Sequence, residues 1–188
     1  MLELRPCGIA RSPPFRPHEL TVNPVAIAAA QPADIPIVQR LAREIWLRHY
    51  PGIISGEQID YMLAQGYSSA ALMKYLTAAD AGLAIALFAN APVGFIGWCR
   101  QDGGAVMKLE KLYVLPERHG EGVGRALIEH AVMRASRCGC RSMTLNVNRG
   151  NTSAIRAYER CGFEIRERGD FPIGGGFVME DFIMVREL

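Results

Sequence analysis

The chain lacks a long apolar segment and a strong excess of either charge. No apolar run approaches the roughly 20 residues that span a bilayer, and residues 83–89 are long enough only for a strand. The 21 Lys and Arg residues nearly balance the 19 Asp and Glu residues, so the net charge of +2 does not indicate a nucleic-acid or membrane partner. At 188 residues, 49% of them hydrophobic, the chain has the composition of one soluble globular domain.

Cysteine occurs in a pattern that suits neither a disulfide framework nor zinc. The five cysteines are an odd set, and the one close pair, Cys138 and Cys140, lacks the spacing and the nearby histidine of a tetrahedral zinc site. We therefore expect reduced thiols, no bound metal and a cytoplasmic location. Residues 1–23 lack apolar periodicity and hold four prolines, so we expect a flexible extension before a domain over residues 24–188.

Two common phosphate-binding motifs are also missing. The chain contains no Gly-Lys-Ser/Thr triplet of a Walker loop, and it does not meet the spacing of a Rossmann fingerprint. The chain has instead a strand-like segment that ends at Pro116. Glycines follow at positions 120, 122 and 124, where an amphipathic helix is predicted to begin. Such glycines let backbone N–H groups approach an anion, for example a pyrophosphate, at the positive end of a helix. Alone this signal is weak, because glycines also cap ordinary helices.

The order of apolar patterns predicts a mixed α/β domain with one sheet. Ser55 and Gln58 have the spacing of a capping box at the start of the second helix. The predicted elements are a strand at 25–30, a helix at 34–48, two short helices from 55 and from 68 or 69, a β-meander at 83–115, a helix at 122–137, a strand at 143–147, a helix at 151–160, and strands at 163–167 and 177–185 around a loop at 169–176.

Two segments resemble the Gcn5-related N-acetyltransferases. Residues 119–124 are similar to the family's Gln/Arg-x-x-Gly-x-Gly/Ala loop, with histidine in place of the usual Gln or Arg. Residues 151–163 resemble its Asn-x-x-Ala-x-x-x-Tyr-x-x-x-Gly-Phe signature, in the expected order and separation. The resemblance implies the acyl-CoA N-acyltransferase fold over residues 25–188, acetyl-CoA as cosubstrate without a metal, and a small-molecule amine as acceptor. It leaves a homodimer open.

By this resemblance, the glycine loop holds the pyrophosphate through backbone N–H groups, and the strand before it grips the pantetheine. The Val114 N–H is then the oxyanion donor to the thioester. Asn151 either donates its amide to the cofactor or acts as the N-cap of its helix, or does both. The cofactor-binding residues implied are Leu112, Tyr113, Val114, His119, Gly120, Glu121, Gly122, Val123, Gly124, Arg125, Asn151 and Tyr158.

The resemblance makes Tyr158 the general acid, since a phenol with a pKa of about 10 can protonate a departing thiolate. The alternative for Tyr158 is a packed aromatic. The base stays open, because some relatives place a glutamate where this chain has Asn146, which cannot accept a proton. Glu110 is the next catalytic candidate, acting through water, or it is a solvated partner of Lys108 or Lys111.

Residues 45–63 and the tail after Asp170 are similar to bacterial spermidine/spermine acetyltransferases of the PaiA type, which implies a polyamine acceptor. Other acceptors left open are an antibiotic amine, an amino acid and a protein N-terminus. A non-catalytic acyl-CoA sensor with the same fold is the competing function. A polycationic acceptor would require an acidic groove. The residues that could line such a groove, or that are otherwise scattered surface charges, are Glu44, Glu57, Asp60, Glu180 and Asp181.

Overall fold

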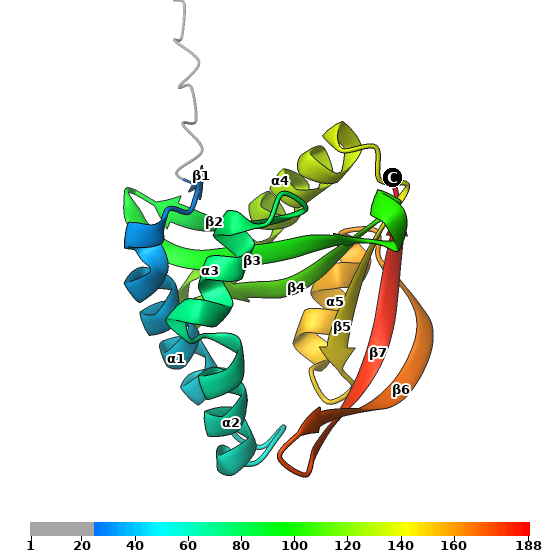
Figure 1. Cartoon of the computed structure of the whole chain (residues 1–188). Helices are drawn as coiled ribbons and strands as arrows, with labels where there is room; N and C mark the ends of the chain where they lie inside the picture. The colour runs from blue at the N-terminus through cyan, green and yellow to red at the C-terminus, as the bar shows by residue number, and fades with distance from the viewer. Residues whose placement is uncertain (1–24) are drawn as a thin grey trace, which may run out of the picture.

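A seven-stranded sheet in the order β1-β2-β3-β4-β5-β7-β6 organises the protein, whose computed structural model describes residues 25–188 (Figure 1). The expected extension over residues 1–23 lies outside the described residues. Among the seven strands of residues 25–188, only β4 and β5 pair in parallel. The mixed α/β fold predicted from the sequence is confirmed. The strands are β1 Val25–Ala29, β2 Ala81–Phe88, β3 Ala91–Gln101, β4 Val106–Val114, β5 Ser142–Asn148, β6 Glu164–Gly174 and β7 Phe177–Glu187.

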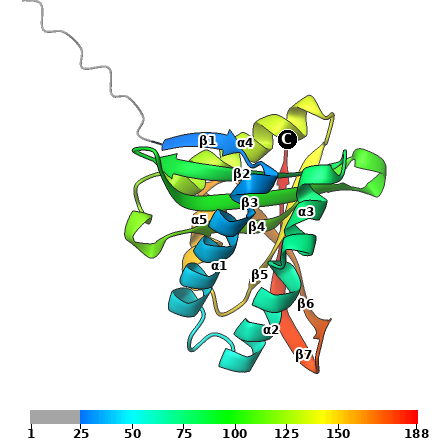
Figure 2. The same cartoon turned by 60° about the vertical axis from the view of Figure 1, so that its left-hand side comes forward.

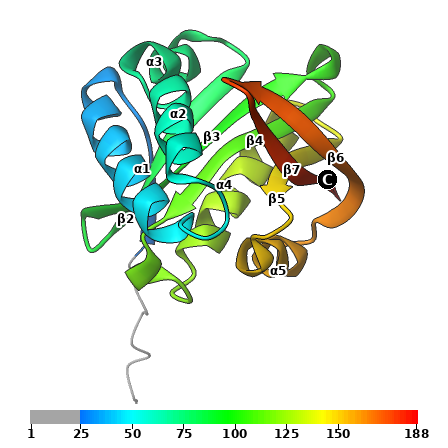
Figure 3. The same ribbon diagram turned by 90° about the horizontal axis from the view of Figure 1, so that it is seen from below.

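Helices cover both faces of the sheet, α1 to α3 on one and α4 and α5 on the other (Figures 1 and 3). Neighbouring residues of β2 therefore enter different cores: Leu83 packs with α1, whereas Ala84 packs with α4. Burial on both faces explains why this strand reads as a continuous apolar run. The helices are α1 Ile35–His49, α2 Gly56–Gly66, α3 Ser69–Thr77, α4 Val123–Arg137 and α5 Thr152–Arg160, with 3-10 turns at Pro32–Asp34, Asp102–Gly104 and Pro116–Arg118.

The predicted capping box of α2 is half right. Ser55 is the N-cap and its hydroxyl accepts a hydrogen bond from the Gln58 N–H at 3.1 Å. The Gln58 side chain does not return to the cap; its amide donates to the Val178 carbonyl at 3.2 Å. The Gln58 side chain therefore makes a tertiary hydrogen bond in place of the local capping-box bond, and this hydrogen bond connects α2 to β7.

The predicted loop at 169–176 is wrong, because most of it is strand. β6 continues to Gly174 and pairs with β7 up to Phe177. The turn is confined to the three glycines 174–176, all with positive φ. Gly169 and Pro172 argued against a strand in the sequence. β6 is the edge strand of the sheet, however, and a proline is tolerated there because its missing N–H would face solvent and not a neighbouring strand.

The parallel pair β4–β5 separates part of the way along. Pairing runs from Val106–Ser142 to Leu109–Leu145 and then stops, although β4 continues to Val114 and β5 to Asn148. The two strands diverge from that point (Figures 1 and 2). At the same place β4 carries a bulge, since Gly97 pairs with Lys111 and Trp98 with Leu109, leaving Glu110 unpaired. The separation leaves one edge of β4 without a partner strand.

Candidate active site

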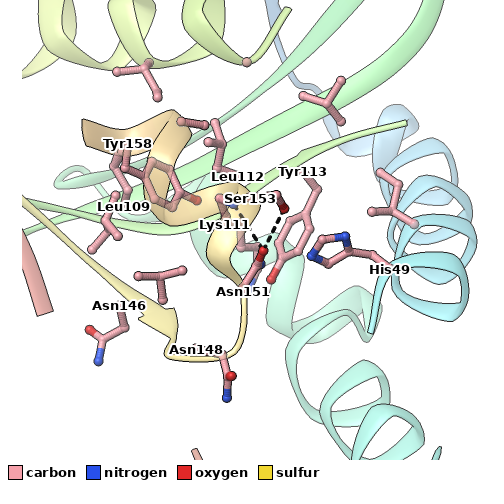
Figure 4. A pocket seen from close by; sticks show the side chains of 18 of the residues that line it. His49, Leu109, Lys111, Leu112, Tyr113, Asn146, Asn148, Asn151, Ser153 and Tyr158 are labelled. Carbon is pink, nitrogen blue, oxygen red and sulfur yellow. Dashed lines mark hydrogen bonds between the residues drawn. The ribbon is translucent and has the colours of Figure 1, made fainter. Parts of the chain in front are cut away.

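A cleft of about 810 Å³ occupies the space between the separated strands. It is lined by the end of β4, the loop before α4, the N-terminus of α4, and parts of α1, α5 and the β6–β7 hairpin. Figure 4 shows Tyr113, Asn151, Tyr158 and His49 converging on it. Of the residues expected at the site, the lining contains Glu110, Leu112, Tyr113, Val114, His119, Gly120, Gly122, Gly124, Arg125, Asn151 and Tyr158.

The free edge of β4 presents backbone groups to this cleft. The Leu115 N–H donates to the Val93 carbonyl at 2.8 Å, so the preceding pair, Val114 with Gly94, is not hydrogen-bonded. In an antiparallel ladder the backbone groups of such a residue point away from the partner strand. The Val114 N–H and carbonyl therefore face the open side, where the His119 ring already donates from Nε2 to that carbonyl at 3.0 Å.

The glycine loop requires glycine for its backbone conformation. Gly120 and Gly122 have φ of +83° and +82°, which disfavours any side chain, and a Cβ at either position would meet nothing within 4 Å. Gly122 is the N-cap of α4, and no side chain caps the helix. The Ala126 N–H is the first to find an acceptor within the helix, so the N–H groups of Val123 to Arg125 remain available.

Positive charge is also present in the lining, from Arg118 before the glycine loop, Arg125 in the first turn of α4 and Arg160 at the end of α5. Free N–H groups at a helix N-terminus, open space above two glycines and guanidinium groups together fit a pyrophosphate. Two expected residues do not line the cleft. Glu121 forms an ion pair with Arg118 at 3.3 Å, and the Val123 side chain is fully buried in the core. Any contact that these two make with a cofactor comes from their backbone.

Tyr158 lies on the cleft-facing side of α5 (Figure 4). Its ring contacts Phe163 edge-on at 6.0 Å, so the packed-aromatic role exists. The hydroxyl has no hydrogen-bond partner among residues 25–188 and stays free for a ligand. Burial raises the pKa of Tyr158, with a smaller contribution from Cys161, so the phenol is protonated at neutral pH.

Asn151 is confirmed as the N-cap of α5. Its Oδ1 accepts from the Ala154 N–H at 3.2 Å and from the Ser153 hydroxyl at 3.1 Å. The carbonyl end of the amide is thus engaged at the start of α5, and the Asn151 side chain lies near His49, at the end of α1 (Figure 4). Burial lowers the pKa of His49, although Asn151 opposes the shift, and this histidine is neutral at pH 7.

Glu110 lies at the bulge of β4 and is exposed. Its carboxylate accepts a hydrogen bond from the Tyr75 hydroxyl. The expected ion pair with Lys108 or Lys111 does not form within the described part of the chain. Instead the Lys111 ammonium lies 4.7 Å from the ring centre of Tyr67, and burial lowers its pKa.

The acidic groove expected from the sequence has only one of its proposed members. Glu44 pairs with Arg48 at 3.4 Å and Glu180 with Arg149 at 3.1 Å, both outside the cleft lining. Glu57 and Asp60 are exposed on α2 and also lie outside it. Of the five acids, Asp181 lines the cleft. Lys108 and Lys111 line it as well, and the sequence did not predict these two basic residues there.

Asp181 is the buried charge of the site. It is 6% exposed, and its Oδ1 has no hydrogen-bond partner in the described chain. Burial raises its pKa, while Asn146, Arg149 and Lys108 oppose the shift. A sequence signal for this burial exists: Asp181 follows Met179 by two residues on β7, and alternate residues of a strand share a face.

A parallel strand pair that opens beside a glycine-led helix N-terminus, with a free phenol on the following helix, defines an acyl-CoA-dependent N-acyltransferase. The chain belongs to the Acetyltransferase (GNAT) family, whose sequence profile matches residues 41–163. It is therefore an acetyl-CoA-dependent N-acetyltransferase with an amine as acceptor. Residues 25–188 contain no group of three or more His, Cys, Asp and Glu side chains placed to hold a metal ion, and no helix among them is long and apolar enough to cross a membrane.

Similar proteins come from bacteria and archaea. An uncharacterized N-acetyltransferase of Mycobacterium tuberculosis is 33% identical over 138 residues, which are 73% of this chain and 87% of that protein. The spermidine N(1)-acetyltransferase of Thermoplasma acidophilum is 28% identical over 151 residues, 78% of this chain and 90% of its own length. The crystal structure of PaiA N-acetyltransferase from the same organism, in complex with coenzyme A, superposes with a TM-score of 0.75 at 24% identity, covering 87% of this chain and 99% of that one.

Proposed function

We propose that the protein transfers the acetyl group of acetyl-CoA to a primary amine by direct attack, with Tyr158 as the general acid. The observation that carries the proposal is the free Tyr158 hydroxyl, which lines the same cleft as the open edge of β4 and the glycine loop. A cofactor held along that edge brings its thioester sulfur to the phenol side of the cleft. Tyr158 then protonates the thiolate as the C–S bond breaks.

The backbone supplies most of the proposed cofactor contacts. N–H groups of residues 120–125 hold the pyrophosphate, with the guanidinium of Arg125 beside them. The strand segment Leu112, Tyr113 and Val114 binds the pantetheine, and the Val114 N–H polarises the thioester carbonyl. His119 links the loop to the strand through its hydrogen bond with the Val114 carbonyl, so we propose that its ring also orders the loop around the cofactor.

The Asn151 side chain completes the proposed cofactor site. Its carbonyl oxygen is committed to the start of α5, which fixes the direction of its NH₂ group. A donor fixed in this way offers a hydrogen bond to the pantetheine at no further entropic cost. The N-cap role and the cofactor role are compatible in this geometry.

A polyamine is the acceptor class that we propose to test first. Similarity to a protein named spermidine N(1)-acetyltransferase supports it. Two carboxylates in the lining, Glu110 and Asp181, offer anionic partners for ammonium groups. Lys108 and Lys111 in the same lining oppose a highly charged polycation, so a short amine with few charges fits the cleft better than a long one.

An acceptor panel with mass detection tests the proposal. Spermidine, spermine, simple alkylamines, amino acids, an aminoglycoside and N-terminal peptides are incubated with acetyl-CoA, and thiol release is followed in parallel. Acetylated product from at least one amine is the expected result. Tight acetyl-CoA binding without product from any of them supports the non-catalytic sensor instead.

We also propose a cytoplasmic location, which the free cysteines Cys99, Cys138, Cys140 and Cys161 support. Cell fractionation with an antibody to the protein tests the location. A homodimer is the assembly to look for, and sedimentation of the purified protein at several concentrations measures it.

A further inference from the structure

Asp181 lies on the face of β7 that also carries the apolar side chains of Phe177 and Met179. On β7 it shares the inward face with Met179, and both line the cleft at the end formed by the β6–β7 hairpin. Its chain neighbour Glu180 points the other way and pairs with Arg149. A buried carboxylate among apolar neighbours is costly unless something in the site compensates for it.

One oxygen of this carboxylate is left without compensation. Within residues 25–188 the Oδ1 of Asp181 has no donor, although only 6% of the residue is exposed. Asn146, the residue that stands where some relatives carry a glutamate, faces the carboxylate from β5. A free, desolvated oxygen that lines a cleft is a site for a hydrogen-bond donor from a ligand.

Glu110 is a poorer partner for an acceptor amine. It is exposed, its carboxylate is already bonded to the Tyr75 hydroxyl, and it also lines a separate hollow of about 350 Å³ beside α3. Water solvates an exposed carboxylate well, so it gains little from binding an ammonium group. The Asp181 carboxylate is buried and its Oδ1 has no hydrogen-bond partner in the described chain, so it gains more free energy than Glu110 from binding an ammonium group.

We infer that Asp181 binds the ammonium group of the acceptor through Oδ1 and takes its proton, which makes it the catalytic base. This inference rests on the proposed acetyl transfer. The ammonium nitrogen gives one proton to Asp181, and its freed electron pair forms the N–C bond to the thioester carbon. As the C–S bond breaks, sulfur takes the Tyr158 proton, and the nitrogen gives up its second proton to restore Tyr158 through water. Asp181 then releases its proton to solvent.

The groups that face Asp181 determine its pH dependence. They are Lys108 on β4, Arg149 after β5 and the Tyr50 phenol after α1, together with the neutral amide of Asn146. Asn146, Arg149 and Lys108 favour the charged form of the carboxylate and oppose the effect of burial on its pKa, and the charged form is the one that accepts a proton in the proposed step. Activity that depends on this carboxylate is lost as the pH falls through its raised pKa.

The test is Asp181→Asn, with spermidine and butylamine as acceptors between pH 6 and pH 10. We expect kcat/KM for the amine to fall by about 10² or more at neutral pH, with the affinity for acetyl-CoA unchanged. The variant lacks a base and can use only the unprotonated amine present in solution. A plot of its log(kcat/KM) against pH should therefore rise with a slope of about 1 up to the amine pKa. The wild type, which binds the ammonium form, should give a flat plot in the neutral range. The deficit should therefore shrink at high pH.

Stability gives an independent readout. Because burial raises the pKa of Asp181, the folded state holds the neutral carboxyl better than the unfolded state does, and the charged form lowers stability above that pKa. The midpoint of thermal unfolding of Asp181→Asn at pH 8 should therefore equal or exceed that of the wild type. Asp181→Ser replaces it if the asparagine variant does not fold.

Control variants separate the possible outcomes. Glu180→Gln changes the neighbouring acid on the opposite face and should retain wild-type rates; Glu110→Gln should lose less than Asp181→Asn. A variant at 181 with unchanged kcat/KM, or with a lower rate and a pH profile parallel to that of the wild type, overturns the role of Asp181 and leaves the acetyl transfer standing. A wild-type protein that acetylates no amine refutes the transfer itself.

Discussion

At the scale of single residues, burial shifts the pKa values of two side chains that line the cleft, and both are uncharged at neutral pH. Burial keeps the Tyr158 phenol protonated, as an acid must be, and keeps His49 neutral. The free hydroxyl and the edge-on contact with Phe163 occur together, so the proposed catalytic role of Tyr158 is compatible with its packing role.

Replacing Tyr158 by Phe tests this assignment. The ring and its contact with Phe163 remain, so we expect the fold and the acetyl-CoA affinity to be preserved. Turnover should fall by about 10² or more, because the thiolate must then leave without an acid. Steady-state rates with saturating acetyl-CoA measure the change, and a fully active variant returns Tyr158 to a packing role.

At the scale of elements, the loop and helix that we propose to bind the cofactor are joined by glycines with positive φ. Gly122→Asp puts a carboxylate where the pyrophosphate is proposed to lie. We expect acetyl-CoA affinity to fall at least tenfold, about 1.4 kcal/mol or more, from charge repulsion and the lost approach of the backbone. Titration calorimetry measures the affinity.

The matched control for that substitution is Gly139→Asp. Gly139 also has positive φ, at +73°, and open space around its Cβ position, but it follows the far end of α4 and does not line the cleft. It carries the same kind of backbone strain and the same new charge. Equal losses of affinity in the two variants mean that strain, and not the pyrophosphate site, explains the effect.

The β6–β7 hairpin is held against α2, on the side of the cleft where we propose that the acceptor binds. The Tyr61 hydroxyl donates to the Ile173 carbonyl at 3.0 Å, and its ring contacts Phe177 at 5.4 Å. Tyr61→Phe keeps the ring and removes the hydrogen bond, so we expect a loss of about 1 kcal/mol in stability.

The same variant tests which side of the cleft the hairpin serves. Phe171, Ile173, Met179 and Asp181 contribute to the lining from β6 and β7. A loosened hairpin should raise KM for the amine about two- to threefold while KM for acetyl-CoA stays constant. Bisubstrate kinetics separate the two constants, and a change confined to acetyl-CoA contradicts the placement of the acceptor.

At the scale of the whole molecule, the end of the cleft that we propose for the acceptor is assembled from α1, α2, β4 and β7, and it is lined by both acidic and basic side chains. If a second ammonium of a polyamine is held there, spermidine should react faster than butylamine, and its KM should rise more with ionic strength because salt screens the attraction. Asp60→Asn should not reproduce that rise, since Asp60 lies outside the lining. Initial rates over a range of NaCl concentrations measure both effects, and salt-independent KM values for both amines contradict the polyamine assignment.

Local rules were enough for much of the fold. Ser55 and Asn151 are the N-caps that their positions predict, and the three alternating glycines lie at the start of α4. These features depend on residues three or four positions apart, so the sequence carries them directly. The edge strand β6 was missed because Gly169 and Pro172 argue against a strand unless its place at the border of the sheet is known.

The sequence by itself determined the order of the elements, the glycine turn and the Asn151 to Phe163 frame, because short-range hydrogen bonding and backbone sterics decide them. Only the tertiary structure decided which acids reach the cleft. Register places Asp181 opposite Asn148 on β7 and β5, where the separation of β4 from β5 opens the space in front of it. Glu57 and Asp60 look equally suitable in the chain, yet helix α2 turns them to solvent. Whether a charged side chain is buried depends on the packing of elements that are far apart in the sequence, so no local sequence pattern predicts it.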